Sequence, residues 1–139
     1  MASTPSAKWI VCRKPRPHAT MRLFCMAWAG GNSTAFGKWK GILPESLEVN
    51  AIELPGRISR AKERCLTSMA EIVLGIAQAL TSLELLDKPY AFFGHSMGAL
   101  VAFELALKLV ADGEPTPAHL IVSGCRPPNV SYSWSQVCR

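Results

Sequence analysis

Several kinds of sequence feature are missing from this 139-residue chain, and each absence narrows its class. None of its five cysteines forms a C-x-x-C pair, so the pattern of a zinc site is absent. No apolar run reaches the roughly 18 residues that a membrane span requires. A secretory signal is also lacking. We therefore expect no metal, no membrane span, and free thiols in a cytoplasmic location.

Charge is also scarce, because only 18% of the residues are charged while 49% are hydrophobic. This balance is typical of a globular domain. The net charge of +5 is modest, and we expect no nucleic-acid partner. Much of it lies in residues 1–20, which we interpret as a disordered leader. A targeting peptide and a patch that docks an anionic partner are the alternatives.

The most informative stretch is Gly94-His-Ser-Met-Gly98, which fits the pattern G-x-S-x-G. An apolar segment over 90–93 predicts a strand before it, and residues 97–111 predict a helix after it. In such a nucleophile elbow the backbone at Ser96 is strained, and Gly94 and Gly98 leave room for neighbouring backbone. The N–H of Met97, at the start of the helix, is then one natural donor to an oxyanion.

The rest of the chain predicts alternating strands and helices. We expect strands over 21–27, 47–54, 90–93 and 119–123, and helices over 34–43, 68–86 and 97–111. Asn32 or Ser33 caps the first helix, and Ser68-Met-Ala-Glu71 matches a capping box for the second. This order indicates an α/β fold with a mostly parallel sheet and helices on both faces.

The pattern stops after Gly124, and residues 129–139 predict only an irregular tail. A parallel sheet that ends on a new strand leaves apolar surface uncovered. We therefore expect the domain to be incomplete at its C-terminal end, either as a fragment or because the last residues replace a longer ending.

Four segments together resemble the type II thioesterases, including the animal medium-chain acyl-carrier-protein thioesterases. They are Arg22-Leu-Phe-Cys-Met-Ala-Trp-Ala-Gly-Gly31, Phe36 with Trp39, Leu54-Pro-Gly-Arg57 and Phe92-Phe-Gly-His-Ser-Met-Gly-Ala99. The resemblance covers residues 21–128 in matching order. It implies the N-terminal part of an α/β-hydrolase domain that hydrolyses acyl thioesters for fatty acid, polyketide or peptide synthases.

The resemblance also implies roles and partners. Ser96 matches the family's nucleophile, and the Met97 N–H matches one oxyanion donor. Ala29, which precedes the double glycine, matches the second oxyanion donor. The substrate is an acyl thioester on coenzyme A or on the phosphopantetheine arm of a carrier protein or synthase, and no cofactor is required.

The sequence departs from the family pattern at the base that should activate Ser96. The triad order on this fold is serine, acid, histidine, and in the family the acid and the base lie beyond the position of Arg139. We interpret His95 as a structural residue of the elbow, His119 as a strand-edge residue and His18 as solvated. Two alternatives stay open: a form without turnover that binds a carrier protein, and another serine esterase.

Overall fold

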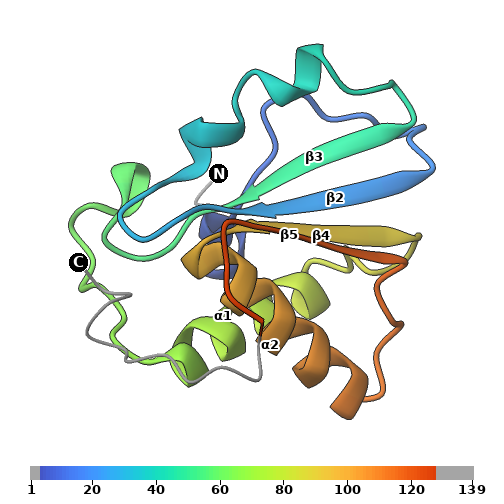
Figure 1. Cartoon of the computed structure of the whole chain (residues 1–139). Helices are drawn as coiled ribbons and strands as arrows, with labels where there is room; N and C mark the ends of the chain where they lie inside the picture. Colours follow the sequence, from blue (N-terminus) through green and yellow to red (C-terminus); the bar gives the residue numbers. More distant parts are fainter. Residues whose placement is uncertain (1–3, 128–139) are drawn as a thin grey trace.

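We describe the protein from a computed structural model, which describes residues 4–127. A five-stranded sheet organises it (Figure 1). Its strands, in the spatial order β1-β3-β2-β4-β5, are β1 (Ile10–Val11), β3 (Leu47–Ile52), β2 (Met21–Met26), β4 (Tyr90–His95) and β5 (His119–Ser123). All neighbours pair in parallel except β1, which runs antiparallel to β3. The predicted α/β class and mostly parallel sheet are confirmed.

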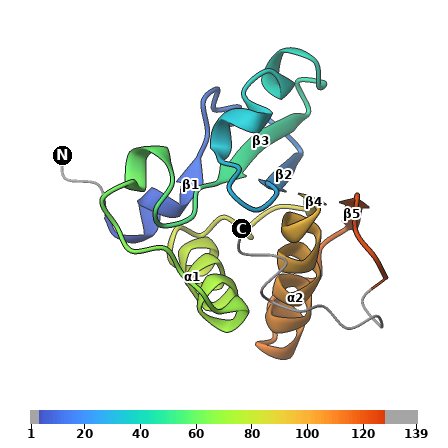
Figure 2. The ribbon, with the colours of Figure 1, turned by 60° about the vertical axis from the view of Figure 1, so that its left-hand side comes forward.

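Two different layers cover the two faces of the sheet (Figure 2). Helices α1 (Met69–Ser82) and α2 (Met97–Ala111) pack on one face, and the short 3-10 helices η2 (Ser33–Phe36) and η3 (Trp39–Gly41) pack on the other. Alternation along β2 serves both layers, because Phe24 lies in the core under α1 and α2 whereas Leu23 and Cys25 lie in the opposite core. The central strand is therefore buried on both sides.

Helices α1 and α2 begin where the sequence predicts. The Ser68 side chain caps α1 by accepting a hydrogen bond from the Glu71 N–H at 3.4 Å. Helix α1 ends at Ser82, earlier than the predicted residue 86. Near that end the Thr81 hydroxyl donates back to the Ala77 carbonyl, and Glu84 adopts a positive φ of 54°. Hydroxyl groups that bond to the preceding turn weaken helix propagation.

The predicted helix over 34–43 is wrong, because two 3-10 helices stand in its place: η2 (Ser33–Phe36) and η3 (Trp39–Gly41). Glycines at 37 and 41 interrupt this stretch, and glycine is a poor helix former. Asn32 caps η2, since its side-chain oxygen accepts from the Thr34 N–H at 2.9 Å. Phe36 and Trp39 nevertheless pack together on the sheet, with ring centroids 5.0 Å apart.

The expected disordered leader over residues 1–20 differs from the structure in its described part. Residues Ser6–Trp9 form the 3-10 helix η1, and β1 follows and pairs with β3. The Trp9 ring lies under the Arg60 guanidinium, 4.4 Å from its centroid, and against the backbone of Gly75 in α1. These contacts bury apolar surface of the Trp9 side chain, which the composition of residues 1–20 did not indicate.

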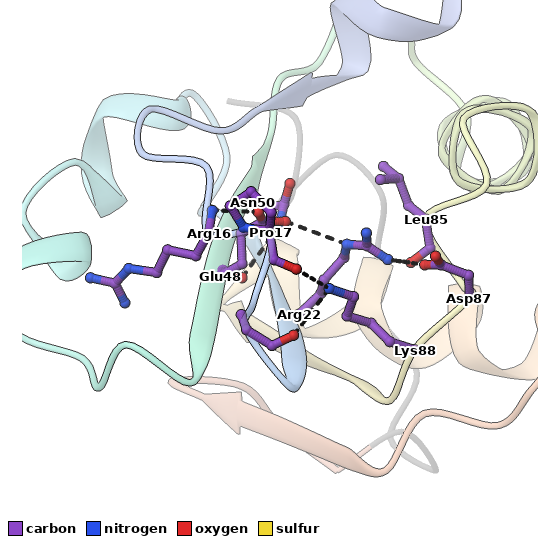
Figure 3. A network of polar contacts seen from close by, with 9 residues as sticks. Arg16, Pro17, Arg22, Glu48, Asn50, Leu85, Asp87 and Lys88 are labelled. Carbon is purple, nitrogen blue, oxygen red and sulfur yellow. Dashed lines mark hydrogen bonds and ion pairs between the residues drawn. The ribbon is translucent and has the colours of Figure 1, made fainter.

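A polar cluster around Glu48, which we call the Glu48 network, ties the segment before β2 to the N-terminal ends of the parallel strands (Figure 3). Glu48 accepts from the Arg16 N–H at 2.7 Å and from the Asn50 amide at 3.2 Å, and it pairs with Arg22 at 3.4 Å. The Arg22 guanidinium also binds the Leu85 carbonyl at 2.9 Å and contacts the Asp87 carboxyl group. Lys88 donates to the Ala19 carbonyl at 3.0 Å.

At the other side of the sheet, β5 is an edge strand with exposed apolar side chains at Leu120, Ile121 and Val122. The predicted tail over 129–139 lies outside the described residues.

A short 3-10 helix, η4 (Ile58–Arg60), follows the turn after β3. In the described chain, no helix is long and apolar enough to cross a membrane.

Candidate active site

Ser96 occupies the turn between β4 and α2, at the C-terminal edge of the sheet. Its backbone has φ 55° and ψ −116°, a conformation that a residue with a side chain rarely adopts. Such strain persists only where the surroundings impose it, and it gathers at functional sites. The predicted strand and helix on either side are both present.

The two elbow glycines are required by close backbone packing. A Cβ atom at Gly94 would lie 2.1 Å from the Gly98 carbonyl oxygen. A Cβ atom at Gly98 would lie 2.1 Å from the carbonyl oxygen of Met26 and 2.6 Å from that of Ala27. Because backbone atoms cannot rotate away as a side chain can, any larger residue must displace β2 or α2.

The backbone N–H groups of Ser96 and Met97 at the elbow differ in their hydrogen bonding. The Ser96 N–H donates to the Ser123 carbonyl at 2.8 Å, which extends the pairing of β4 with β5. Met97 is the first residue of α2, and N–H groups in a first helical turn have no acceptor within the helix. The Met97 N–H therefore has no acceptor within α2, which agrees with its predicted role as an oxyanion donor.

A loop over residues 27–32 follows β2 and contains Ala29, the predicted second oxyanion donor, and after that prediction we call it the oxyanion loop. Met26, the last residue of β2, pairs with Gly94 of β4, so the loop starts beside the elbow. The Trp28 ring lies edge-on to the His95 ring, with centroids 6.1 Å apart. A positive φ of 78° at Gly30 and a hydrogen bond from the Gly31 N–H to the Trp28 carbonyl at 2.9 Å turn the loop back.

Among the described residues, none of the three histidines forms a hydrogen bond with the Ser96 hydroxyl. The His95 ring binds the Ser123 hydroxyl through Nδ1 at 3.1 Å. His119 pairs with Ala91 at the opposite end of β4, about 13 Å or more along the strand from the elbow. His18 is exposed in the segment before β2.

The space beside the elbow is small and apolar. A cavity of about 20 Å³ lies between Met26, Ile76 and Met97, enough for roughly one water molecule.

Among residues 4–127 no group of three or more histidine, cysteine or acidic side chains could hold a metal ion. Cys25 is buried in the core, and this burial raises the pKa of its thiol to about 12, so it is no nucleophile at neutral pH.

The structure brings Glu53 and Ser33 together at the end of the oxyanion loop, which the sequence did not predict. The Ser33 N–H and hydroxyl donate to the two carboxyl oxygens of Glu53, at 3.1 Å and 2.7 Å. In the sequence, Glu53 lies in the strand predicted over 47–54, and a glutamate is rarely buried unless it is paired. Its partner lies 20 residues earlier, and no local pattern links the two.

Comparisons with known proteins agree with this geometry. A family model described as Thioesterase domain matches residues 21–137. The gramicidin S biosynthesis protein GrsT of Aneurinibacillus migulanus is 42% identical over 123 residues, which cover 88% of this chain and 47% of the relative. The human medium-chain S-acyl fatty acid synthase thioesterase is 40% identical over 126 residues, covering 91% and 47%.

A solved structure supports the same relationship. RedJ, a thioesterase from the prodiginine biosynthetic pathway in Streptomyces coelicolor, matches with a TM-score of 0.80 and 41% identity, over 84% of this chain and 43% of that one. The chain spans about half the length of the curated relatives it matches. The family match and the parallel sheet with its serine elbow agree, and the chain belongs to the thioesterase domain family, with type II thioesterases among its relatives.

Proposed function

We propose that Ser96 is the nucleophile of an acyl thioester hydrolase. The observation that carries this proposal is the strained backbone of Ser96 between β4 and α2, in a chain of the thioesterase family. In the proposed reaction the Ser96 hydroxyl oxygen attacks the thioester carbonyl carbon, the thiol leaves, and water then hydrolyses the acyl-serine ester. The elbow supports the proposal because it exposes this hydroxyl at the edge of the sheet.

We assign oxyanion stabilisation to the backbone N–H groups of Met97 and Ala29. The first belongs to the opening turn of α2, and the second to the loop that starts beside the elbow. In other serine hydrolases one donor of this kind contributes about 10²–10³-fold in rate. Gly94 and Gly98 serve the site indirectly, since they allow β2, β4 and α2 to approach one another.

We further propose that full activity requires a histidine other than His18, His95 and His119. A serine hydroxyl without an adjacent base is a weak nucleophile at neutral pH. In the family that the sequence resembles, the other two triad residues, an acid and a base, lie beyond the position of Arg139. A rate from binding and the oxyanion donors alone would be smaller by several orders of magnitude than that of a complete triad.

The substrate that we propose is an acyl group in thioester linkage to a phosphopantetheine carrier protein, or to coenzyme A, and the partner is the synthase that bears it. Support comes from relatives whose names place them in fatty acid synthase and biosynthetic pathways. We also propose a cytoplasmic location, which agrees with free thiols at Cys12, Cys25 and Cys65.

Labelling with a fluorophosphonate probe, combined with acyl-coenzyme A turnover, tests the proposal on the 139-residue chain. We expect Ser96→Ala to abolish any labelling and any turnover while the fold is retained. Labelling that survives Ser96→Ala would refute the nucleophile assignment. Faster hydrolysis of p-nitrophenyl esters than of acyl thioesters would instead favour an oxygen-ester hydrolase.

The positions of the three histidines favour a second candidate, a form that binds a carrier protein without turnover. Acyl-carrier-protein binding by calorimetry, together with no labelling and no turnover, would support that candidate. Turnover that depends on Ser96 would exclude it.

A further inference from the structure

A buried carboxyl group lies at the end of the oxyanion loop, and the reaction proposed above gives it no chemical part. Glu53 is 1% exposed and its partner Ser33 is 2% exposed. The Ser33 N–H and hydroxyl occupy both carboxyl oxygens, at 3.1 Å and 2.7 Å. Burying a carboxyl group is unfavourable unless it is hydrogen-bonded, so this contact specifies where Ser33 must lie.

Glu53 is itself fixed by contacts from two other segments. Its N–H donates to the Trp9 carbonyl, and its carbonyl accepts from the Arg60 guanidinium, both at 2.9 Å. The Arg60 guanidinium also stacks on the Trp9 ring and forms a two-point contact with Glu63, at 2.7 Å and 2.9 Å. The carboxyl group is therefore a rigid anchor rather than a mobile surface acid.

The oxyanion loop is held at both of its ends. It leaves the sheet after Met26, next to the elbow, and β3 lies beside β2 with Ala51 opposite Cys25. Glu53 follows β3 directly, so the loop departs beside the end of β3 and returns to the same place when Ser33 binds Glu53. Between these two ends the loop is only six residues long, which leaves its backbone little freedom.

Two contacts transmit this restraint to the elbow. The first turn of α2 rests on the start of the loop, because a Cβ atom at Gly98 would lie 2.6 Å from the Ala27 carbonyl oxygen. On the other side, the Trp28 ring lies edge-on to His95, which precedes Ser96. A shift of the loop at Ser33 would consequently move the Ala29 backbone relative to Ser96.

We propose that Glu53 is a positioning residue: through Ser33 it holds the oxyanion loop in one conformation, with the Ala29 N–H facing the site of the developing oxyanion. The catalytic meaning of this contact rests on the function proposed above, whereas the restraint on the loop does not. Because a misplacement of about 1 Å in an active site can reduce a rate about 10²-fold, a loosened loop should act on rate more than on substrate binding.

Amide hydrogen exchange measured by mass spectrometry tests the restraint directly. We expect Ser33→Ala to raise exchange in peptides covering 27–33 while peptides of α2 stay unchanged. The matched control is Ser59→Ala, at an exposed serine of η4, which should alter neither region. Unchanged exchange in 27–33, or an equal rise in α2, would overturn the proposal.

The variant Glu53→Gln separates positioning from charge. A glutamine amide can accept from the Ser33 N–H and donate to its hydroxyl, so both contacts survive. We expect its exchange pattern to match the parent, and its rate of fluorophosphonate labelling at Ser96 to stay within about threefold. Ser33→Ala should slow labelling about tenfold. A loosened loop with an unchanged labelling rate would refute the positioning role.

The restraint on the loop and the catalytic activity of the chain have separate readouts. If the parent chain neither labels nor turns over, catalysis by this chain alone is excluded, and the exchange result still decides whether Glu53 and Ser33 hold the loop. If the parent labels and turns over, the positioning role requires that Ser33→Ala lowers kcat while KM changes less than about threefold. An effect confined to KM would contradict it.

Discussion

The two ends of the parallel sheet are held together by opposite means. At the C-terminal edge, the elbow depends on missing side chains, since Gly94 and Gly98 let three backbone segments touch. At the N-terminal edge, the Glu48 network joins charged side chains from segments far apart in the sequence (Figure 3). Backbone contact fixes a strained serine without placing a competing charge beside it, whereas side-chain pairs anchor segments that have no regular structure.

The largest effect should follow from Gly98→Ala. Its Cβ atom would meet two backbone carbonyl oxygens at 2.1 Å and 2.6 Å, and neither can move without shifting β2. We expect a loss of about 3 kcal/mol or more in the free energy of unfolding, measured by urea denaturation. Gly41→Ala is the control, because nothing lies within 4 Å of its Cβ position. Equal stability of the two variants would show that the elbow is not tightly packed.

A smaller effect is expected at the other edge, from Glu48→Ala. This change leaves the Arg16 N–H, the Asn50 amide and the Arg22 guanidinium without their shared acceptor. We expect a loss of about 2 kcal/mol in the same measurement. A loss larger than that of Gly98→Ala would reverse the comparison between the two edges.

The same network predicts how stability depends on pH. Burial acts to raise the pKa of Glu48, but the hydrogen bonds from Arg16 and Asn50 and the charge of Arg22 outweigh it, so the pKa lies below its ordinary value of 4.5. A lowered pKa in the folded state contributes stability that is present above pH 4.5 and is lost as the pH falls through the folded value. Glu48→Gln should flatten this acid loss, and an unchanged acid profile would contradict the assignment.

Strain at the elbow predicts a gain rather than a loss. Glycine adopts φ 55° and ψ −116° without a Cβ clash, so Ser96→Gly should stabilise the fold by about 1 kcal/mol. Ser96→Ala keeps the Cβ atom and should leave the thermal midpoint unchanged. Equal midpoints for the two variants would show that the serine backbone is not strained.

The smallest effect is expected for an exposed ion pair near the Glu48 network. Lys14 lies 3.9 Å from Glu45, and both side chains are largely in solvent. Lys14→Ala should change the free energy of unfolding by less than about 0.5 kcal/mol. A loss comparable to that of Glu48→Ala would mean that charge itself, and not buried pairing, holds this edge.

Prediction from the sequence succeeded where the signal was local. Strand β4, helix α2 and the Ser68 cap are each encoded within a few neighbouring residues, and the structure contains them. Prediction failed where the partner was distant. Trp9 acquires its place only when Arg60 and Gly75 surround it, and Glu53 becomes a buried anchor only because Ser33 reaches it. Periodicity describes one element at a time, so it carries no information about such pairs.

The hydrogen bond from the Ser96 N–H to the Ser123 carbonyl has a consequence for the order of folding. Its two ends lie 27 residues apart, and a strained backbone is stable only when its surroundings are already in place. We therefore expect β5 to dock before the elbow closes, so that the elbow forms late in folding. On a chain emerging from the ribosome, the serine would acquire its shape only after the polypeptide had grown past Ser123.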